Sequence, residues 1–184
     1  MNVSGGDGQW HRASADVVQQ VWAASKGNPK IFSMMMAQMS RESGFNAGAI
    51  QQGVPESQRG YGIAQFTATL GSAGLKKYLG SSDPAVWHKA ALNQKRAIAG
   101  LEAYDHDLLA ASGGNMQQAL AAFNGGPHPN AQACAYGAAV ASSAQQIEGS
   151  LDVTVTLKDS HGTTVAKQHP RATVRPPKGH KNPI

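Results

Sequence analysis

The amino-acid sequence predicts a mainly α-helical domain that ends in a short β or extended segment. Three observations support this prediction. Apolar residues recur at helical spacing through much of residues 14–148, between short segments rich in glycine and proline. Capping residues stand where these apolar stripes begin. In residues 151–158, apolar and polar side chains instead alternate one by one, which is the period of a β-strand.

Length and composition favour one globular domain and exclude several other classes. The chain has 184 residues, of which 41% are hydrophobic, so it can bury a sizeable core. Its single cysteine, Cys134, excludes a disulfide scaffold, and the alanine-rich surroundings predict that this cysteine is a small buried residue. No stretch approaches the roughly 18 apolar residues of a membrane span. The first ten residues lack the basic and apolar regions of a signal peptide.

Composition and charge divide the chain into a flexible, glycine-rich lead-in (1–13), a helical domain (14–148) and a basic tail (149–184). Lys and Arg outnumber Asp and Glu by only 10 to 9 in residues 1–150, but by 6 to 2 in residues 151–184. Such a tail is typical of a solvated extension or of a segment that docks onto an anionic polymer or a protein. It lacks the interleaved aromatic residues of nucleic-acid binders, so no nucleic-acid partner is expected.

The domain opens with two helices whose ends are marked by the sequence. Ser14 is an N-cap, and the KGNP sequence at 26–29 stops the first helix with a glycine and a proline. The second helix is predicted from Pro29 to Glu42. The three consecutive methionines at 34–36 favour core packing over a metal or cofactor site, because two of them lie on the apolar stripe.

The next segment contains a long loop. Residues 43–60 show little periodicity, and a loop of about 18 residues in a compact domain is usually functional. Residues 61–70 are predicted to form a tight turn that leads into a short helix, capped near Thr67 or Thr69. Glycines at 71, 74 and 80 punctuate the stretch that follows, and no further helix is assigned to it.

A third helical region starts at a capping Asp-Pro pair. One continuous helix is predicted over residues 83–111, with an apolar inner face, and the glycine pair at 113–114 ends it. Asn115 opens another helix, which stops at the NGGP sequence of residues 124–127. Residues 130–147 are alanine-rich and helical by propensity.

The tail changes to β-strand chemistry. A strand is predicted from Leu151 to Lys158, followed by a turn at 159–162 and a returning strand at 163–166. A lone hairpin is marginally stable in water, so this one needs a partner surface. The remaining tail residues are expected to be extended or disordered.

Glu42 is the strongest local signal for chemistry. It lies three residues after Met39 and seven after Met35, which places it on the apolar face of its helix. Partial desolvation raises the pKa of a carboxyl, and so does the negative end of a helix dipole. Both effects favour the protonated form that a general acid requires. The alternative is an exposed carboxylate paired with Arg41 or another cation.

Three motifs then occur in order along the domain: ESGFN at 42–46, GYGIAQF at 60–66 and ALAAFNGGP at 119–127. This set resembles the lytic transglycosylase family of the soluble-lytic-transglycosylase type, which is goose-lysozyme-like and belongs to the lysozyme superfamily. The family patterns are E-S-G-F-N, then G-L-M-Q or the phage-like G-L-x-Q-F, then A-L-A-A-Y-N-A-G-P. The resemblance covers about residues 14–145 and implies a lysozyme-like helical fold. It does not extend to the tail.

The resemblance implies a substrate and a reaction. The family cleaves the β-1,4 bond between N-acetylmuramic acid and N-acetylglucosamine in peptidoglycan. Glu42 matches its single catalytic acid, which protonates the glycosidic oxygen and then acts as base on the muramic C6 hydroxyl, leaving a 1,6-anhydro end. The positions that match the family's substrate-binding motifs are Ser43, Tyr61, Gly62, Gln65, Phe66, Asn124 and Tyr136.

Individual roles follow from the same resemblance. Ser43 matches the serine that helps to position the substrate or the carboxyl. Gly62 matches a glycine that lets the backbone approach the sugar, and Gln65 matches a glutamine that contacts saccharide. Tyr136 resembles a later tyrosine whose hydroxyl lies near the acid.

The sequence departs from the family pattern at two places, and Glu56 leaves a hydrolytic reaction as an alternative. Phe123 stands where the family usually has tyrosine, and residues 63–64 are Ile-Ala instead of Leu-Met. The insert before Gly60 carries one carboxylate, Glu56, and in goose-type lysozymes acidic residues in this region help to orient a hydrolytic water. A second carboxyl at about 6.5–9.5 Å from Glu42 would suit an inverting muramidase. Otherwise Glu56 is a solvated loop residue.

Other chemistry is not expected from the sequence. Asp105, His106 and Asp107 are consecutive on a predicted helix, so they point in different directions and do not form a metal site. No nucleophile elbow, phosphate loop or dinucleotide fingerprint occurs. Neither a metal nor a cofactor is therefore expected.

Location and partners remain expectations. A wall-cleaving enzyme acts in the bacterial cell wall or periplasm, and without a signal peptide it would be delivered by a phage virion or released at lysis as an endolysin. Its partner would be the peptidoglycan glycan strand, with the tail docking onto other virion or secretion-machine proteins. In a different class, the chain would be a structural phage-tail or secretion component with a weak or vestigial site.

Overall fold

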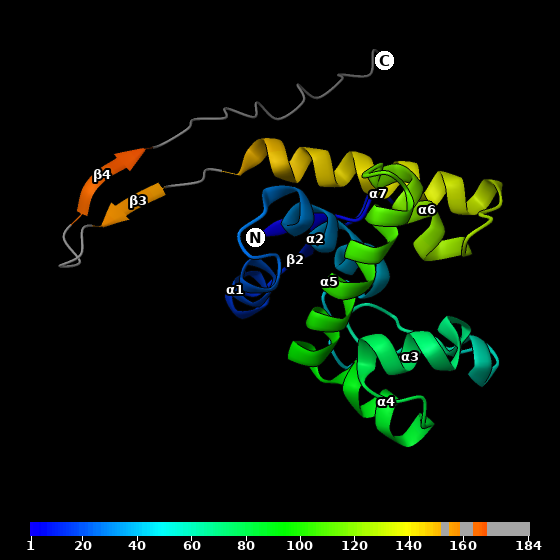
Figure 1. Ribbon diagram of the computed structural model, residues 1–184. Helices are drawn as coiled ribbons and strands as arrows, with labels where there is room; N and C mark the ends of the chain where they lie inside the picture. Colours follow the sequence, from blue (N-terminus) through cyan, green and yellow to red (C-terminus); the bar gives the residue numbers. More distant parts are fainter. Residues whose placement is uncertain (152–154, 159–163, 169–184) are drawn as a thin grey trace, which may run out of the picture.

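The computed structural model describes residues 1–151 and, beyond them, the backbone of two strands at 155–158 and 164–168. It confirms the predicted mainly α-helical fold (Figure 1). The helices are α1 (Ala15–Ala24), α2 (Pro29–Ser43), α3 (Gly71–Leu79), α4 (Pro84–Leu92), α5 (Gln94–Ala111), α6 (Met116–Gly125) and α7 (Ala131–Ser150), with the 3-10 turns η1 (Glu56–Gln58) and η2 (Ala68–Leu70).

The long helix α5 joins two groups of helices, which Figure 1 shows on opposite sides of the molecule. Helices α3 and α4 pack on it in one group, and α2 and α6 in the other, where α7 covers both α2 and α6. Helix α2 is central, since every residue from Phe32 to Ser40 is buried. Its methionines at 34–36 are fully buried, as the sequence predicts, and the buried polar residues Gln38 and Ser40 are hydrogen-bonded to Asp105 and to the Val3 carbonyl. Among the described residues, no helix combines the length and apolar character needed to cross a membrane.

The predicted capping residues begin the helices as expected. The Ser14 hydroxyl accepts from the Val17 amide at 3.2 Å and starts α1. Asn115 caps α6 in the same way. Asn28 and Asn130, which were not predicted as caps from the sequence, also accept amide hydrogen bonds at the starts of α2 and α7. These side chains satisfy amides that have no partner within their own helix.

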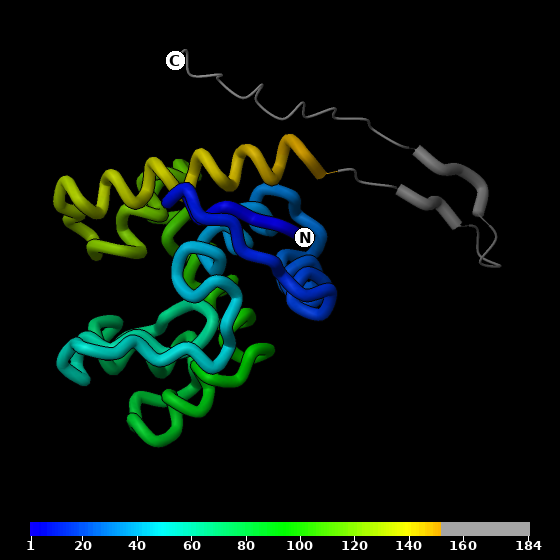
Figure 2. The backbone as a smooth tube through the Cα atoms, turned by 180° about the vertical axis from the view of Figure 1, so that it is seen from behind, coloured from blue at the N-terminus to red at the C-terminus, as the bar shows by residue number. Residues whose placement is uncertain are grey.

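The predicted flexible lead-in is wrong for most of its length, because residues 1–12 form a hairpin. Strand β1 (Asn2–Ser4) pairs antiparallel with β2 (Trp10–Arg12), in the register Val3 opposite His11. Val3 is fully buried, and its carbonyl accepts a 2.9 Å hydrogen bond from the Ser40 hydroxyl of α2. Figure 2 shows this hairpin in dark blue against α2 and α7. Contacts with α2 and α7 hold this hairpin in place. The segment is too short to show a periodic sequence pattern, so its strands could not be predicted.

Two further predictions about helices are corrected. Helix α3 occupies the stretch in which the sequence assigned no helix, and Gly71 and Gly74 lie within it. The single helix predicted over 83–111 is two helices, because Asn93 adopts an extended conformation with ψ 110° between α4 and α5. Its side chain accepts from the Arg96 amide at 3.1 Å, so one asparagine ends α4 and caps α5.

Cys134 is also misplaced by the sequence interpretation, since it is exposed. The buried face of α7 runs through Ala133 and Gly137, and Cys134 lies about 100° around the helix from Ala133.

At the other end of α7, the predicted C-terminal hairpin is confirmed by antiparallel pairing of β3 (Val155–Lys158) with β4 (Thr164–Gln168). Leu151 ends α7 instead of opening the strand. The predicted turn at 159–162 and the end of the tail lie outside the described residues.

Candidate active site

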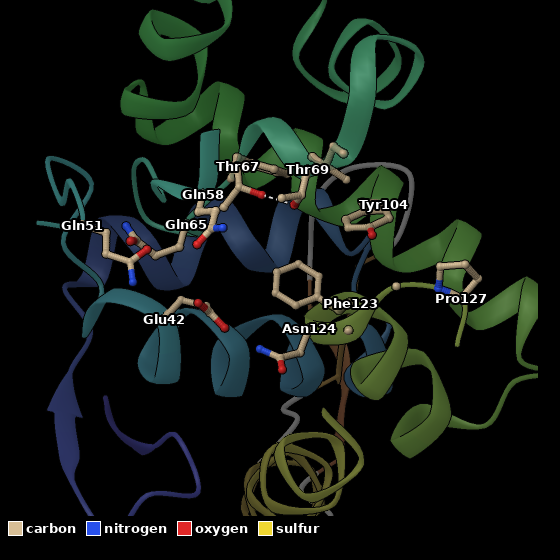
Figure 3. Close-up of a pocket in the computed structure, with 14 residues that line it drawn as sticks. Glu42, Gln51, Gln58, Gln65, Thr67, Thr69, Tyr104, Phe123, Asn124 and Pro127 are labelled. Carbon is tan, nitrogen blue, oxygen red and sulfur yellow. Dashed lines mark hydrogen bonds between the residues drawn. The ribbon is translucent and has the colours of Figure 1, made fainter. Parts of the chain in front are cut away.

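A pocket of about 870 Å³ opens between the C-terminal ends of α2 and α6 and the segment 51–70. Figure 3 shows Glu42 and Asn124 on one wall, facing Gln58, Gln65, Thr67 and Thr69 on the other. Glu42 is the one carboxylic acid that lines it within the described residues. The remaining lining side chains are amides, hydroxyls, aromatic rings and small apolar groups, from Gln51, Gln58, Gln65, Phe66, Thr67, Thr69, Leu70, Tyr104, Phe123, Asn124 and Pro127.

Glu42 sits in the last turn of α2 and is half-buried. The Tyr136 hydroxyl of α7 donates a hydrogen bond to its Oε1 at 2.5 Å. Burial raises the pKa of the Glu42 carboxyl above its usual range, while the Tyr136 hydrogen bond and the positive charge of Arg41 oppose that rise. Desolvation is the largest of these effects. Glu42 is therefore biased toward the protonated form.

Tyr136 is held in place by its ring. Phe123 of α6 stacks on it with centroids 6.5 Å apart, and the guanidinium carbon of Arg41 lies 6.0 Å from its centroid. Burial, followed by the negative charge of Glu42, raises the pKa of Tyr136 well above its ordinary value. The hydroxyl therefore keeps its proton and acts as a permanent donor to Glu42.

The second motif folds into a tight turn beside the pocket. Tyr61 and Phe66 exchange two backbone hydrogen bonds of 2.9 and 3.0 Å. Gln65 closes the turn with a left-handed φ of 51° and a side-chain hydrogen bond of 2.8 Å to the Gly62 carbonyl. This conformation is unusual for a side chain larger than asparagine, and it directs Gln65 to the pocket wall.

Gly62 does not lie where its backbone could approach a sugar in the pocket. It is buried, does not line the pocket and has a φ of 74°. A Cβ atom at this position would lie 1.8 Å from the Ala91 carbonyl oxygen of α4. The missing side chain therefore lets the turn pack on α4, which the sequence alone did not indicate.

Tyr61 and Ser43 likewise support the site from behind its surface. Tyr61 is 5% exposed, stacks on His88 at 4.0 Å and meets Trp87 edge-on at 5.2 Å. The Ser43 hydroxyl donates to the Ile63 carbonyl at 2.8 Å. Neither lines the pocket. Ser43 thereby ties the end of the Glu42 helix to the turn that carries Gln65.

Phe66, Gln65 and Asn124 do lie on the pocket wall, as the motif resemblance implies. Glu56 does not: it is exposed on η1, and only its neighbour Gln58 from that turn reaches the pocket. Sequence reasoning did not select Gln58, Thr67, Thr69 or Tyr104 as site residues. The richness of the 51–69 segment in uncharged polar residues was the available signal.

Asp105, His106 and Asp107 diverge, as helical geometry requires. Asp105 is fully buried and accepts a 3.0 Å hydrogen bond from the Gln38 amide. His106 is exposed, while Asp107 accepts from the Tyr78 hydroxyl at 2.6 Å and pairs with Lys77. No cluster of three or more metal-binding side chains occurs in the described part of the chain.

No protein-family model, curated protein or solved structure matches this chain. The chemistry of the site must therefore be interpreted from its own geometry and motifs. That geometry combines one desolvated carboxyl, a fixed hydroxyl partner and a facing wall of neutral hydrogen-bonding groups.

Proposed function

We propose that the protein is a lytic transglycosylase that cleaves the β-1,4 bond between N-acetylmuramic acid and N-acetylglucosamine in peptidoglycan. The observation that supports this most is Glu42, a desolvated carboxyl without a carboxylate partner in the described pocket. The three ordered motifs at 42–46, 60–66 and 119–127 supply the link to the family.

The pocket chemistry suits an uncharged sugar chain. Amide and hydroxyl side chains can donate to and accept from sugar hydroxyls and acetamido groups. Phe66, Tyr104 and Phe123 add apolar surface for the sugar rings. Among the described residues, no Lys or Arg lines the pocket, whereas a phosphate-binding site would need such a cation.

The proposed mechanism uses Glu42 twice. Because Tyr136 donates to Oε1, the proton of the neutral carboxyl resides on Oε2. Oε2 gives this proton to the glycosidic oxygen as the bond to C1 breaks. The resulting carboxylate then takes the proton of the muramic C6 hydroxyl, whose oxygen bonds to C1 and closes the 1,6-anhydro ring. Tyr136 stabilises the charged carboxylate between the two steps.

The placement of Glu56 favours this reaction over an inverting muramidase. An inverting hydrolase needs a second carboxylate that activates water across the cleft. Glu56 is exposed and off the pocket wall, and the pocket lining contains no other acid in the described chain. The internal C6 hydroxyl would thus take the place of water.

We therefore infer that its partner is the peptidoglycan strand and its place of action the bacterial cell wall. Delivery by a phage virion or release at lysis fits the phage-like form of the second motif, G-x-x-Q-F, which occurs at 62–66. Docking of the basic tail onto a virion or secretion component extends the same proposal.

Mass spectrometry of the sugars released from purified peptidoglycan tests the proposal. We expect anhydro-muramic ends, which are lighter by one water than hydrolysed ends. Glu42→Gln should reduce release on the order of a thousandfold while its circular dichroism stays unchanged, because the amide cannot donate the proton. Reducing ends would indicate a muramidase instead. No release from the wild-type protein would refute the enzymatic function.

A further inference from the structure

The N-terminal hairpin bridges the two helices that carry Glu42 and Tyr136. An added Cβ at Gly5 would lie 2.6 Å from the backbone of Arg41 in α2. One at Gly6 would lie 2.5 Å from the Ala139 carbonyl oxygen in α7. The hairpin backbone therefore rests directly on both helices (Figure 2). Arg41 precedes Glu42, and Ala139 lies one helical turn from Tyr136, whose hydroxyl bonds to Glu42.

Asp7 stands at the turn of this hairpin with both carboxylate oxygens engaged. Its Oδ1 accepts from the Gln9 amide at 3.0 Å, which orients the carboxylate. Its Oδ2 lies 3.4 Å from the Arg41 Nη1, and both side chains are only 25–33% exposed. The turn thus presents one negative charge to one particular guanidinium.

Arg41 connects this charge to the site. Its guanidinium lies over the Tyr136 ring, and the Tyr136 hydroxyl bonds to Glu42, the residue that follows Arg41. A positive charge here favours the ionised form of Glu42. An Arg41 without a counter-charge would therefore work against a general acid.

We propose that Asp7 is a positioning residue for Glu42: it holds the Arg41 guanidinium on the Tyr136 ring and offsets its charge, so that Glu42 retains its proton in the pocket. The importance of this for catalysis rests on the proposed function, but the electrostatic coupling does not. The other titratable groups near the Glu42–Tyr136 pair are His11 of β2, whose ring contacts Gly44, Tyr104 across the pocket, and Asp105 of α5, whose charge acts on Tyr136. None of them supplies a negative charge in place of that of Asp7 at neutral pH, because burial raises the pKa of Asp105 to about 8.

Carbon-13 NMR titration of the Glu42 carboxyl, without substrate, tests the coupling in the full chain. Asp7→Asn should move the Glu42 midpoint to lower pH, and Asp7→Glu should restore it. Glu148→Gln is the matched control, because it removes the same charge from the Tyr136 helix, twelve residues or roughly 18 Å away. A midpoint in Asp7→Asn no lower than in Glu148→Gln would overturn the proposal.

A double variant separates coupling through Arg41 from a direct charge effect. In an Arg41→Gln background, Asp7→Asn should leave the Glu42 midpoint where it is. An undiminished shift in that background would show that Asp7 acts on Glu42 without Arg41, and would also overturn the proposal. If the wall is cleaved, Asp7→Asn should lower the rate at the alkaline side of the pH profile on the order of twofold. A Glu42 shift in a protein that releases no sugar would refute the proposed function alone.

Discussion

The hydrogen bond between Tyr136 and Glu42 joins two residues that are 94 positions apart in the sequence. It lowers the pKa of Glu42 against the stronger effect of burial, so the carboxyl can both give up a proton and take one back. A carboxyl whose pKa is raised by burial alone would remain protonated and would be a poor source of the carboxylate that the second step requires. The balance between the two effects is therefore the chemical property that the proposed reaction needs.

Replacing Tyr136 by phenylalanine tests this balance. Because the hydroxyl stabilises the charged carboxylate, its loss should raise the pKa of Glu42 and shift the alkaline limb of the pH–rate profile to higher pH. The maximal rate should fall on the order of tenfold, since a hydrogen bond to a charged group contributes about 1.5–3 kcal/mol. The measurement is peptidoglycan cleavage between pH 4 and 9.

Tyr104→Phe is the matched control for this experiment. It removes a hydroxyl from the pocket that Glu42 lines and leaves the Glu42 hydrogen bond intact, since that bond comes from Tyr136. Its pH profile should keep the wild-type limbs. Equal displacement of the limbs in both variants would contradict the role given to the Tyr136 hydroxyl.

At this scale, the sequence predicted what depends on local geometry. Glu42 could be selected because its helical spacing from Met35 and Met39 is a property of one helix. The placements of Gly62 and Tyr61 could not be predicted, because both are decided by contact with α4, a distant element. Motif resemblance identifies such positions but does not say which side of the turn they face.

Among the elements, the turn at 60–66 is the one whose packing decides the shape of the pocket. Ser43 ties it to α2, and Gly62 presses it onto α4. It thereby spans the two groups of helices, with Gln65 on its pocket side. The turn must keep both contacts for Gln65 to face Glu42.

Gly62→Ala should therefore destabilise the protein strongly. The new Cβ would lie 1.8 Å from the Ala91 carbonyl oxygen, so the turn or α4 must move. We expect a loss of about 3 kcal/mol or more in the free energy of unfolding, as for overpacked cores, measured by urea denaturation. At Gly113 φ is 58°, but no atom lies within 4 Å of an added Cβ. Gly113→Ala should therefore lower the free energy of unfolding by only about 1–2 kcal/mol. Equal losses would show that backbone conformation, and not the contact with α4, explains the effect.

Elements were predictable where caps and apolar stripes coincide, as in α1, α2 and α6. Prediction failed where tertiary packing overrides local preference. The glycines of α3 are tolerated because Leu75 and Leu79 bury one face of that helix. The N-terminal hairpin has one buried side chain, Val3, and depends on α2 and α7 for its order.

For the molecule as a whole, the buried pair of Asp105 and Gln38 links α5 to α2 across the core. Asp105 Oδ2 and Gln38 Oε1 are both buried without a hydrogen-bond partner. Two acceptors that face no donor are costly, and a proton on Asp105 would supply the missing donor. Burial raises the pKa of Asp105 to about 8, and the negative charge of Glu102 contributes in the same direction.

This pair makes the stability of the whole fold depend on pH. Asp105 has an unfolded pKa near 3.9, so between about pH 4 and pH 8 the folded state binds the additional proton. The free energy of unfolding should therefore fall as pH rises through this range, by at most about 1.4 kcal/mol per pH unit from this group. Asp105→Asn removes the titrating carboxyl, so it should remove this slope and make the variant more stable than wild type at pH 8. Urea denaturation from pH 5 to pH 8 measures both effects.

Asp107→Asn is the control, because Lys77 and Tyr78 lower the pKa of Asp107, so its contribution is constant above pH 5. Parallel wild-type and Asp105→Asn curves would mean that Asp105 is already ionised in the folded core.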